Sequence, residues 1–162
     1  MLEPVVRDGR PEDLDEVLRL WVQMVEFHAD LDPSLRMRTD SEGQEHMRLF
    51  LQSCLDSPDS RLFVAEVSGR EGLAGFLLAH IRTVSPIALP PAMGYISDIC
   101  VEEALRRQGI GRALYLAARE WFRERGQSVI RLNVATANPV SQAFWRAMGA
   151  VEQMVVLRIE LG

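Results

Sequence analysis

The sequence predicts a mixed α/β fold in a single domain that spans residues 1–162. Segments rich in β-forming residues are interspersed with segments whose apolar residues repeat at helical spacing, in the order strand, two helices, three strands, helix, strand, helix, strand. This order requires both hairpin and crossover connections, which implies a sheet with antiparallel and parallel pairs. The length is sufficient to bury one hydrophobic core.

In the N-terminal half, prolines and glycines mark the boundaries between the expected helices and strands. Pro11 stands at a position that favours a helix start, and an apolar stripe from Leu14 to Val25 follows it. A later helix has Met47, Phe50, Leu51, Cys54 and Leu55 as its expected inward residues. The expected elements are strand 4–7, helix 11–27, an aperiodic loop at 28–40, helix 41–56, and strands 61–67 and 73–81 joined by a turn.

In the C-terminal half, the start and stop signals of the helices are clear. Gly126 suits the end of one helix, while Asn138 and Gly149 suit the two ends of another. The expected elements are a proline-rich loop at 83–93, a buried strand at 94–101, a helix after residue 109, strand 128–135, helix 138–149 and a final strand at 155–161.

Composition excludes several classes of function. The formal net charge of −5 argues against a nucleic-acid partner. All 18 basic residues are arginine, so lysine Schiff-base chemistry is absent. Two cysteines and three widely spaced histidines predict neither a disulfide framework nor a metal site. Since we find no secretory signal and no long apolar run, we expect a cytoplasmic protein without a membrane partner.

The stretch RRQGIG at 106–111 is the strongest candidate for a binding loop. A dinucleotide fingerprint needs a third glycine where this chain has Leu114, and a triphosphate loop needs a lysine, so both fail. The glycines lie between a buried strand and an amphipathic helix, where helix-start amides are free and the helix dipole is positive. Arg106, Arg107 and Arg112 add positive charge, which predicts a pyrophosphate site. A plain turn at a helix start remains the alternative.

The segments ICVEEALRRQGIGRAL and NVATANPVSQAFWRAMGA resemble the GCN5-related N-acetyltransferases. The family motif Arg/Gln-x-x-Gly-x-Gly/Ala is matched by Arg106, Gly109 and Gly111, with Val101 five residues before and Asn138 at the next helix start. The resemblance covers essentially the whole chain. It implies a central mixed, mostly antiparallel sheet that is splayed between strands four and five and carries about four helices.

The resemblance also implies acetyl-CoA as the cosubstrate and no metal. Pantetheine would pair with the fourth strand, and an amide near Cys100 would stabilise the oxyanion. Asn138 would hydrogen-bond the arm or its phosphates, and Trp145 would pack against pantetheine or the core. The residues implied to bind the cofactor are Ile99, Cys100, Val101, Arg106, Arg107, Gln108, Gly109, Ile110, Gly111, Arg112, Asn138 and Trp145.

Two residues are candidates for the general base. Asp98 lies in the apolar run GYISDICV, where burial would raise its pKa toward neutrality. His28 is the alternative, in a loop that would border the acceptor; a structural role is the competing interpretation for each residue. Relatives often have a tyrosine acid where this chain has Trp145. Because a thiol pKa near 8.5 makes thiolate a tolerable leaving group, we expect no acid to be needed.

The acceptor is expected to be a small-molecule amine or a peptide N-terminus. The acidic residues of 28–40 suit a cationic amine, with a solvated loop as the alternative. The expected function is N-acetyl transfer from acetyl-CoA by direct attack. The alternatives are a non-catalytic acyl-CoA-binding regulatory module and a purely structural interaction domain. Dimers occur in the family, so the resemblance admits a homodimer without requiring one.

Overall fold

The computed structural model describes residues 3–162, and its centre is a five-stranded sheet. The spatial order is β1-β2-β3-β4-β5, and every neighbouring pair is antiparallel except β4 and β5, which run parallel. The strands are β1 Pro4–Asp8, β2 Ser60–Val67, β3 Gly75–Thr83, β4 Ala92–Val101 and β5 Ile130–Leu132.

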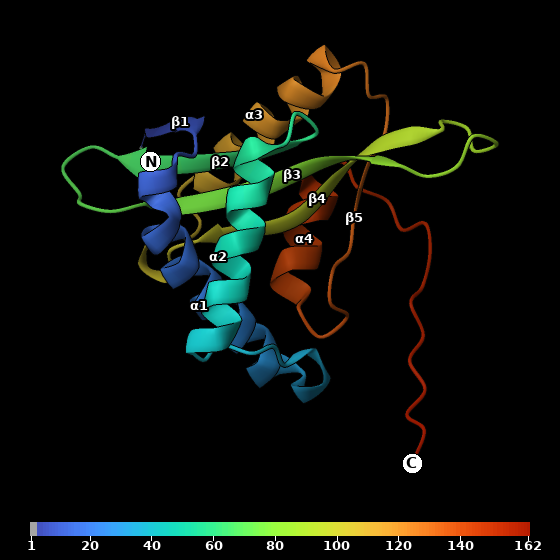
Figure 1. Cartoon of the computed structure of the whole chain (residues 1–162), viewed down its shortest axis with the longest axis horizontal. Coiled ribbons are helices and arrows are strands. Elements are labelled where there is room, and N and C mark those ends of the chain that lie inside the picture. The colour runs from blue at the N-terminus through green and yellow to red at the C-terminus, as the bar shows by residue number, and fades with distance from the viewer. Residues whose placement is uncertain (1–2) are drawn as a thin grey trace.

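Four α-helices cover the two faces of the sheet. Helices α1 and α2 pack on one face and α3 and α4 on the other (Figure 1). The helices are α1 Leu14–Leu31, α2 Ser41–Asp56, α3 Ile110–Glu124 and α4 Pro139–Ala147, with short 3₁₀ turns at Pro11–Asp13, Pro33–Leu35 and Glu103–Leu105. The expected fold class is confirmed.

The central strands are buried on both faces, which explains their nearly continuous apolar sequences. In β2, Leu62 and Val64 face α1 and α2, while Phe63 and Ala65 face α3. Strand β3 repeats this alternation. A strand that is covered by helices on both sides needs apolar residues at consecutive positions, and this is the pattern of both strands.

Two sequence-based expectations in the N-terminal half were wrong. Helix α1 continues to Leu31, so His28 lies in its last turn and not in a loop. The backbone N–H of Asp32 bonds the carbonyl of His28 and closes this helix end at 2.9 Å. Phe50 was expected to point inward, but 45% of its surface is exposed. No helix in residues 3–162 is long and apolar enough to cross a bilayer.

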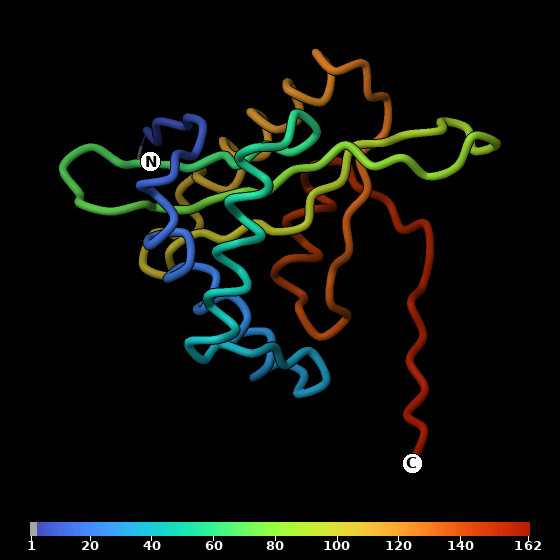
Figure 2. The backbone as a smooth tube through the Cα atoms, in the orientation of Figure 1, coloured from blue at the N-terminus to red at the C-terminus, as the bar shows by residue number. Residues whose placement is uncertain are grey.

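The expected final strand at 155–161 was also wrong. The chain from Ala150 onward is extended, exposed and not paired with any strand that the structure describes. Strand β5 covers only Ile130–Leu132 of the expected 128–135. Figure 2 shows the C-terminal segment running away from the sheet after α4. Alternation indicated a strand, but the segment finds no neighbour within its own chain.

Burial predicts a stability difference between two helix positions. Leu114 in α3 is fully buried, whereas Val140 in α4 is 70% exposed. Leu114→Ala should lower the free energy of unfolding by about 2–5 kcal/mol through lost contacts and a cavity. Val140→Ala, the matched control in another helix, should change it by about 0.5 kcal/mol or less. Urea denaturation followed by circular dichroism measures both, and equal effects would contradict this description of the core.

Candidate functional site

Strands β4 and β5 separate after a short stretch of pairing. They pair only at Gly94–Ile96 with Ile130–Leu132, while β4 stays paired with β3 up to Val101. The amide of Glu102 bonds Ala74 beside β3 at 2.9 Å. Because alternate residues of a strand direct their backbone groups to the same side, those of Ile99 and Val101 point to the opposite, open side.

A β-bulge interrupts β4 where the strands separate. Leu78 pairs with Asp98 and Ala79 pairs with Ile96, so Ser97 is the extra residue. A bulge redirects the side chains around it and is common beside active sites. Here it returns Asp98 to the face of the sheet that carries α1 and α2.

The RRQGIG loop joins the end of β4 to the start of α3. Gly109 is the residue before the helix and adopts φ 86°, a left-handed conformation that glycine reaches without a steric penalty. Within residues 3–162, no acceptor takes a hydrogen bond from the backbone N–H groups of 107–112. The first amide of this region to bond is that of Ala113, which donates to Gly109 at 3.0 Å.

Three arginines surround these free amides. In the part of the chain that the structure describes, Arg106, Arg107 and Arg112 form no salt bridge with a carboxylate. Arg106 donates from Nε to the carbonyl of Val101 at 3.4 Å, and its guanidinium lies 5.2 Å from the ring centre of Phe27. The loop therefore combines free donors with uncompensated positive charge.

The structure brings His28 and Asn138 together from opposite ends of the chain. His28 Nδ1 lies 2.8 Å from the carbonyl of Met24, which can only accept, so Nδ1 carries a proton. The amide nitrogen of Asn138 lies 3.3 Å from His28 Nε2 and donates to its lone pair. Asn138 is buried and caps α4 by accepting from the amide of Ser141.

A chain of hydrogen bonds reaches Asp98 through the sheet. Ser97 Oγ donates to Asp98 Oδ2 at 2.6 Å and lies 3.0 Å from His80 Nε2. Since the single hydroxyl proton of Ser97 goes to the carboxylate, His80 Nε2 must donate to Ser97. His80 Nδ1 then accepts from Ser60 Oγ at 2.9 Å. The chain ends on the carboxylate and holds it in place.

Burial shifts the pKa values of three groups around this chain. It raises the pKa of Asp98, although the bond from Ser97 and, when His28 is protonated, the charge of that imidazole act against it. Burial, with a smaller contribution from the charge of Arg82, lowers the pKa of His80 to about 4. Burial also raises the pKa of Cys100 to about 12, and its Sγ donates to the carbonyl of Leu20. Cys100 is therefore a buried thiol and not an activated nucleophile.

Trp145 lies in the core between α3 and α4. Only 5% of its surface is exposed, and it packs edge-on against Tyr115 with the ring centres 5.7 Å apart. Gly111 faces the other aromatic residue of α4, and a Cβ there would be in van der Waals contact with the ring of Phe144 at 3.4 Å. The two aromatic residues of α4 thus fix the start of α3 against the rest of the protein.

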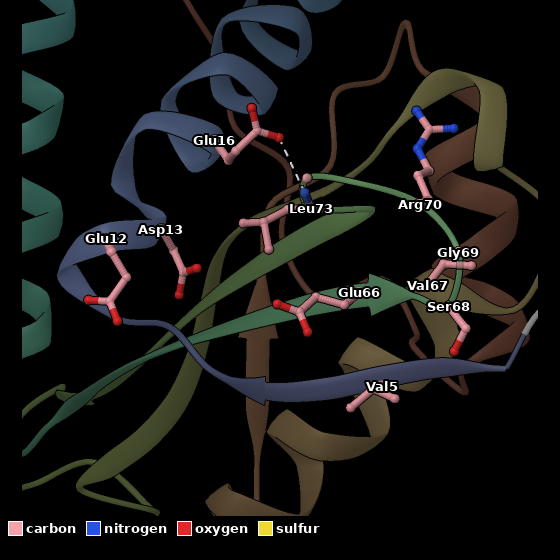
Figure 3. A pocket seen from close by; sticks show the side chains of 11 residues that line it. Val5, Glu12, Asp13, Glu16, Glu66, Val67, Ser68, Gly69, Arg70 and Leu73 are labelled. Carbon is pink, nitrogen blue, oxygen red and sulfur yellow. Dashed lines mark hydrogen bonds between the residues drawn. The ribbon is translucent and has the colours of Figure 1, made fainter.

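A cavity of about 430 Å³ lies elsewhere, between the start of α1 and the β2–β3 turn (Figure 3). Most of its carboxylates already have partners: Asp13 and Glu66 bond Arg7, and Glu16 accepts from the amide of Leu73. An acidic lining repels phosphates, so this cavity does not compete with the loop as an anion site. Residues 3–162 contain no group of three metal-ligating side chains.

The fold and the loop define a mixed α/β protein in which a helix start with free amides adjoins a splayed sheet. The chain belongs to the acetyltransferase (GNAT) family, whose model matches residues 21–150. It is therefore a member of a family of acyltransferases.

Individual relatives agree with this family. An uncharacterised N-acetyltransferase of Methanocaldococcus jannaschii is 25% identical over 93% of this chain, and the chain spans 62% of that protein's length. A mutant of the BH1408 protein from Bacillus halodurans is 25% identical, with a TM-score of 0.83 over 97% of this chain and 99% of that one. The aminoglycoside N-acetyltransferase AAC(6')-Iy, solved with CoA, shares the fold at 18% identity, with a TM-score of 0.76 over 99% and 96% of the two chains.

Sequence reasoning missed His80 and Ser60. They lie 17 or more residues from Ser97 in the chain, and only strand pairing brings them together. A polar residue within the apolar run LAGFLLAHI was the one available signal, because a buried histidine needs partners.

The lowered pKa of His80 predicts a pH-dependent stability. As pH falls below 6.5, His80 binds a proton in the unfolded chain, whereas in the folded protein it stays neutral until the pH nears its lowered pKa of about 4. Stability is therefore full above pH 6.5 and is lost toward pH 4. His80→Gln should reduce this acid loss by up to about 3 kcal/mol.

Urea unfolding at several pH values between 4 and 7 measures the effect. His46→Gln is the control, because His46 is exposed on α2. We expect only His80→Gln to weaken the dependence of the free energy of unfolding on pH. If both variants lost stability with falling pH as the parent protein does, His80 would not be neutral in the folded protein.

Proposed function

We propose that this protein is an N-acetyltransferase that moves an acetyl group from acetyl-CoA to a primary amine by direct attack. The observation that carries the proposal is the run of free amides at 107–112 at the start of α3, beside the unpaired edge of β4. Membership of the acetyltransferase family supports the same reaction class.

The pyrophosphate of the cofactor fits the loop. Free amides at a helix start donate to phosphate oxygens, and the helix dipole favours their charge. Arg107 and Arg112 are exposed and able to approach the phosphates. The guanidinium of Arg106 packs over the ring of Phe27 in α1. AAC(6')-Iy, which shares the fold, was solved with CoA.

The pantetheine arm fits the open side of β4. Its two amides offer donors and acceptors to the backbone of Ile99 and to the N–H of Val101, whose carbonyl already accepts from Arg106. An extended ligand is able to add to such an edge. We propose the amide of Val101 or Cys100 as the donor to the thioester oxygen in the transition state. Of the two, Val101 lies on the open side and is favoured.

Asp98 is the proposed general base. It is half-buried, its pKa is raised, and the Ser97–His80 chain fixes its orientation. A carboxylate whose pKa lies closer to neutrality takes a proton from an ammonium group more readily. His28 is the second candidate, since its Nε2 lone pair is held only by Asn138 at 3.3 Å.

The acetyl-transfer step needs no proton donor from the protein. The amine nitrogen forms a bond to the carbonyl carbon, the C–S bond breaks, the thiolate leaves, and the base takes the proton of the amine. Trp145 is buried in the core and Cys100 is a buried thiol, so neither is positioned to give a proton to sulfur. Thiolate is a stable enough leaving group for this step.

We propose a small amine as the acceptor. Two proteins that share the fold, AAC(6')-Iy and meta-AAC0020, are named as aminoglycoside acetyltransferases. The acidic residues of 28–40 contribute less than the sequence suggests. Asp32 accepts from the amide of Ser34, and Asp40 caps α2 at Gly43. Asp30 stays exposed in the last turn of α1 and is the remaining candidate for a cation contact.

A panel of amines tests the function. The purified protein is mixed with acetyl-CoA and polyamines, aminoglycosides or peptide N-termini, and free CoA thiol and the acetylated product are measured. Transfer to at least one class is expected. CoA binding without transfer to any amine would favour the regulatory module, and absence of CoA binding would favour the structural domain.

Charge at the loop should control cofactor affinity. Gly109→Asp places a carboxylate at the phosphates, so CoA affinity should fall at least about tenfold, which is 1.4 kcal/mol. Gly109→Asn is the matched control, because asparagine has the same shape, tolerates positive φ and is neutral. Calorimetric titration with CoA gives both affinities. Equal losses in the two variants would show that the backbone, and not the charge, is responsible.

Removing the proposed base should slow turnover and spare binding. Asp98→Asn keeps the shape and should lower kcat by about 10²–10⁴-fold while CoA affinity stays within about twofold. His28→Gln is the parallel variant. If His28→Gln lost turnover and Asp98→Asn did not, the base would be His28. The assay is initial rate at saturating acetyl-CoA across pH.

A further inference from the structure

Arginine and tyrosine side chains gather on the part of the sheet where β4 and β5 pair. Tyr95 of β4 lies directly opposite Arg131 of β5. Their neighbours Ile96, Ile130 and Leu132 pack in the core on the α3 side, and successive side chains of a strand point to opposite faces. Tyr95 and Arg131 therefore lie on the face that carries α1 and α2, where neither helix covers β5 (Figure 1).

Arg82 of β3 joins these two residues. Its guanidinium carbon lies 3.4 Å from the ring centre of Tyr95, which is within the range of a cation–π contact. His80 lies two residues before Arg82 on the same face of β3, and the charge of Arg82 contributes to the lowered pKa of this histidine. We call Arg82, Tyr95 and Arg131 the Tyr95 cluster.

The Tyr95 cluster offers hydrogen-bond donors that have no acceptor in residues 3–162. Arg131 Nε is buried and has no partner within these residues, although buried polar groups are normally paired. The hydroxyl of Tyr95 accepts from Asn133 Nδ2 at 3.3 Å, and its own proton reaches no acceptor in the described chain. Neither arginine of the cluster forms a salt bridge with a carboxylate of this part of the protein. Donors and positive charge without a counterpart indicate a site for an anion.

The β-bulge in β4 brings Asp98 next to this cluster. Tyr95 pairs with His80 and Asp98 pairs with Leu78, so the two residues of β4 occupy successive places on one face. Such places are about 7 Å apart along a strand. Because Asp98 is the proposed base, the nitrogen of the acceptor must approach it. An anionic group of the same acceptor would then fall within reach of the cluster.

The cofactor approaches Asp98 from the other direction. Strand β4 runs from Tyr95 past Asp98 to Val101 and then into the loop 106–111, whose amides are free. A pyrophosphate on that loop lies beyond the opposite end of the strand from Tyr95. The anion that suits the Tyr95 cluster is therefore part of the acceptor and not of the cofactor.

We propose that Arg82, Tyr95 and Arg131 bind the anionic group of the acceptor, which is an amine that also carries a carboxylate or a phosphate group. This inference rests on the proposed acetyl transfer and names its substrate class. A guanidinium donates parallel N–H bonds to either anion, and the hydroxyl of Tyr95 supplies a further donor. A polyamine or another purely cationic amine would be repelled by the two arginines.

An apolar side chain lies beside the path between the two ends of such an acceptor. Phe50 of α2 is 45% exposed, and its ring centre lies 6.2 Å from that of His80, the residue opposite Tyr95. Burial against this ring suits the methylene groups that separate an amine from its acid. The surface thus presents a base, an apolar side chain and paired cations in that spatial relation.

Matched pairs of acceptors test the substrate class. Initial rates with acetyl-CoA give kcat/KM for γ-aminobutyrate against its amide and for phosphoethanolamine against ethanolamine. In at least one pair the acid should exceed its neutral partner at least about tenfold, as expected for hydrogen bonds to a charged group. The pair with the larger ratio distinguishes carboxylate from phosphate. Transfer to these amines without a preference for either acid overturns the inference and leaves the acetyltransferase function standing.

Variants of the cluster test which residues carry the preference. The double variant Arg82→Gln/Arg131→Gln should bring both pairs within about twofold by lowering kcat/KM for the acid and not for its neutral partner. Arg119→Gln is the matched control, because Arg119 Nε is also buried without a partner in the described chain but lies on α3. Circular dichroism verifies folding. A preference that survives the double variant overturns the proposal.

A binding measurement decides the inference even if no amine is acetylated. The arginine Nε–H signals of the nitrogen-labelled parent protein are recorded by nuclear magnetic resonance, and those of Arg131 and Arg119 are assigned by their loss in the single glutamine variants. γ-Aminobutyrate or phosphoethanolamine should move the signal of Arg131 and leave that of Arg119 in place, while the amide and ethanolamine should move neither. An Arg131 signal that responds to neither acid overturns the proposal.

Discussion

The parallel pairing of β5 with β4 over three residues is the constraint on which the rest of the site depends. Strand β4 cannot leave the sheet, because β3 holds it along its length. The separation therefore falls on β5, and the backbone of Ile99 and Val101 is left without a neighbouring strand on that side. The same strand leads directly into the loop whose amides at 107–112 are free. An unpaired strand edge and a loop of free amides thus lie in sequence along one stretch of chain.

The two histidines near Asp98 show how burial assigns different roles to one residue type. His80 is enclosed by the sheet and α2, remains neutral over most of the pH range and donates through Ser97 to the carboxylate. His28 lies at the end of α1 and keeps an Nε2 lone pair directed at Asn138. The first orders the carboxylate from inside the protein, and the second is held at the surface of the site by Asn138. The carboxylate of Asp98 is thus oriented by the sheet itself and not by a loop.

Local signals predicted most of the fold, and pairing at a distance accounts for what was missed. The helix starts at Gly109 and Asn138 were predictable, because glycine favours a positive φ and asparagine caps a helix, and both residue types are visible in the sequence. The link between His28 and Asn138 spans 110 residues, and no local pattern encodes it. No sequence pattern predicts the β-bulge at Ser97 either, although this bulge determines the face of the sheet on which Asp98 lies. The motif thus located the loop of free amides, while the contacts of Asp98 and His28 required the structure.

The final strand failed for a different reason. Alternation at 155–161 indicates that one face is suited to burial, but it does not specify what covers that face. In the described chain, the amides of Gly149 and Ala150 bond back to α4, and the segment that follows pairs with no strand. Among the strands of residues 3–162, β5 therefore has only β4 as a neighbour, and the opening beside Val101 depends on three paired residues.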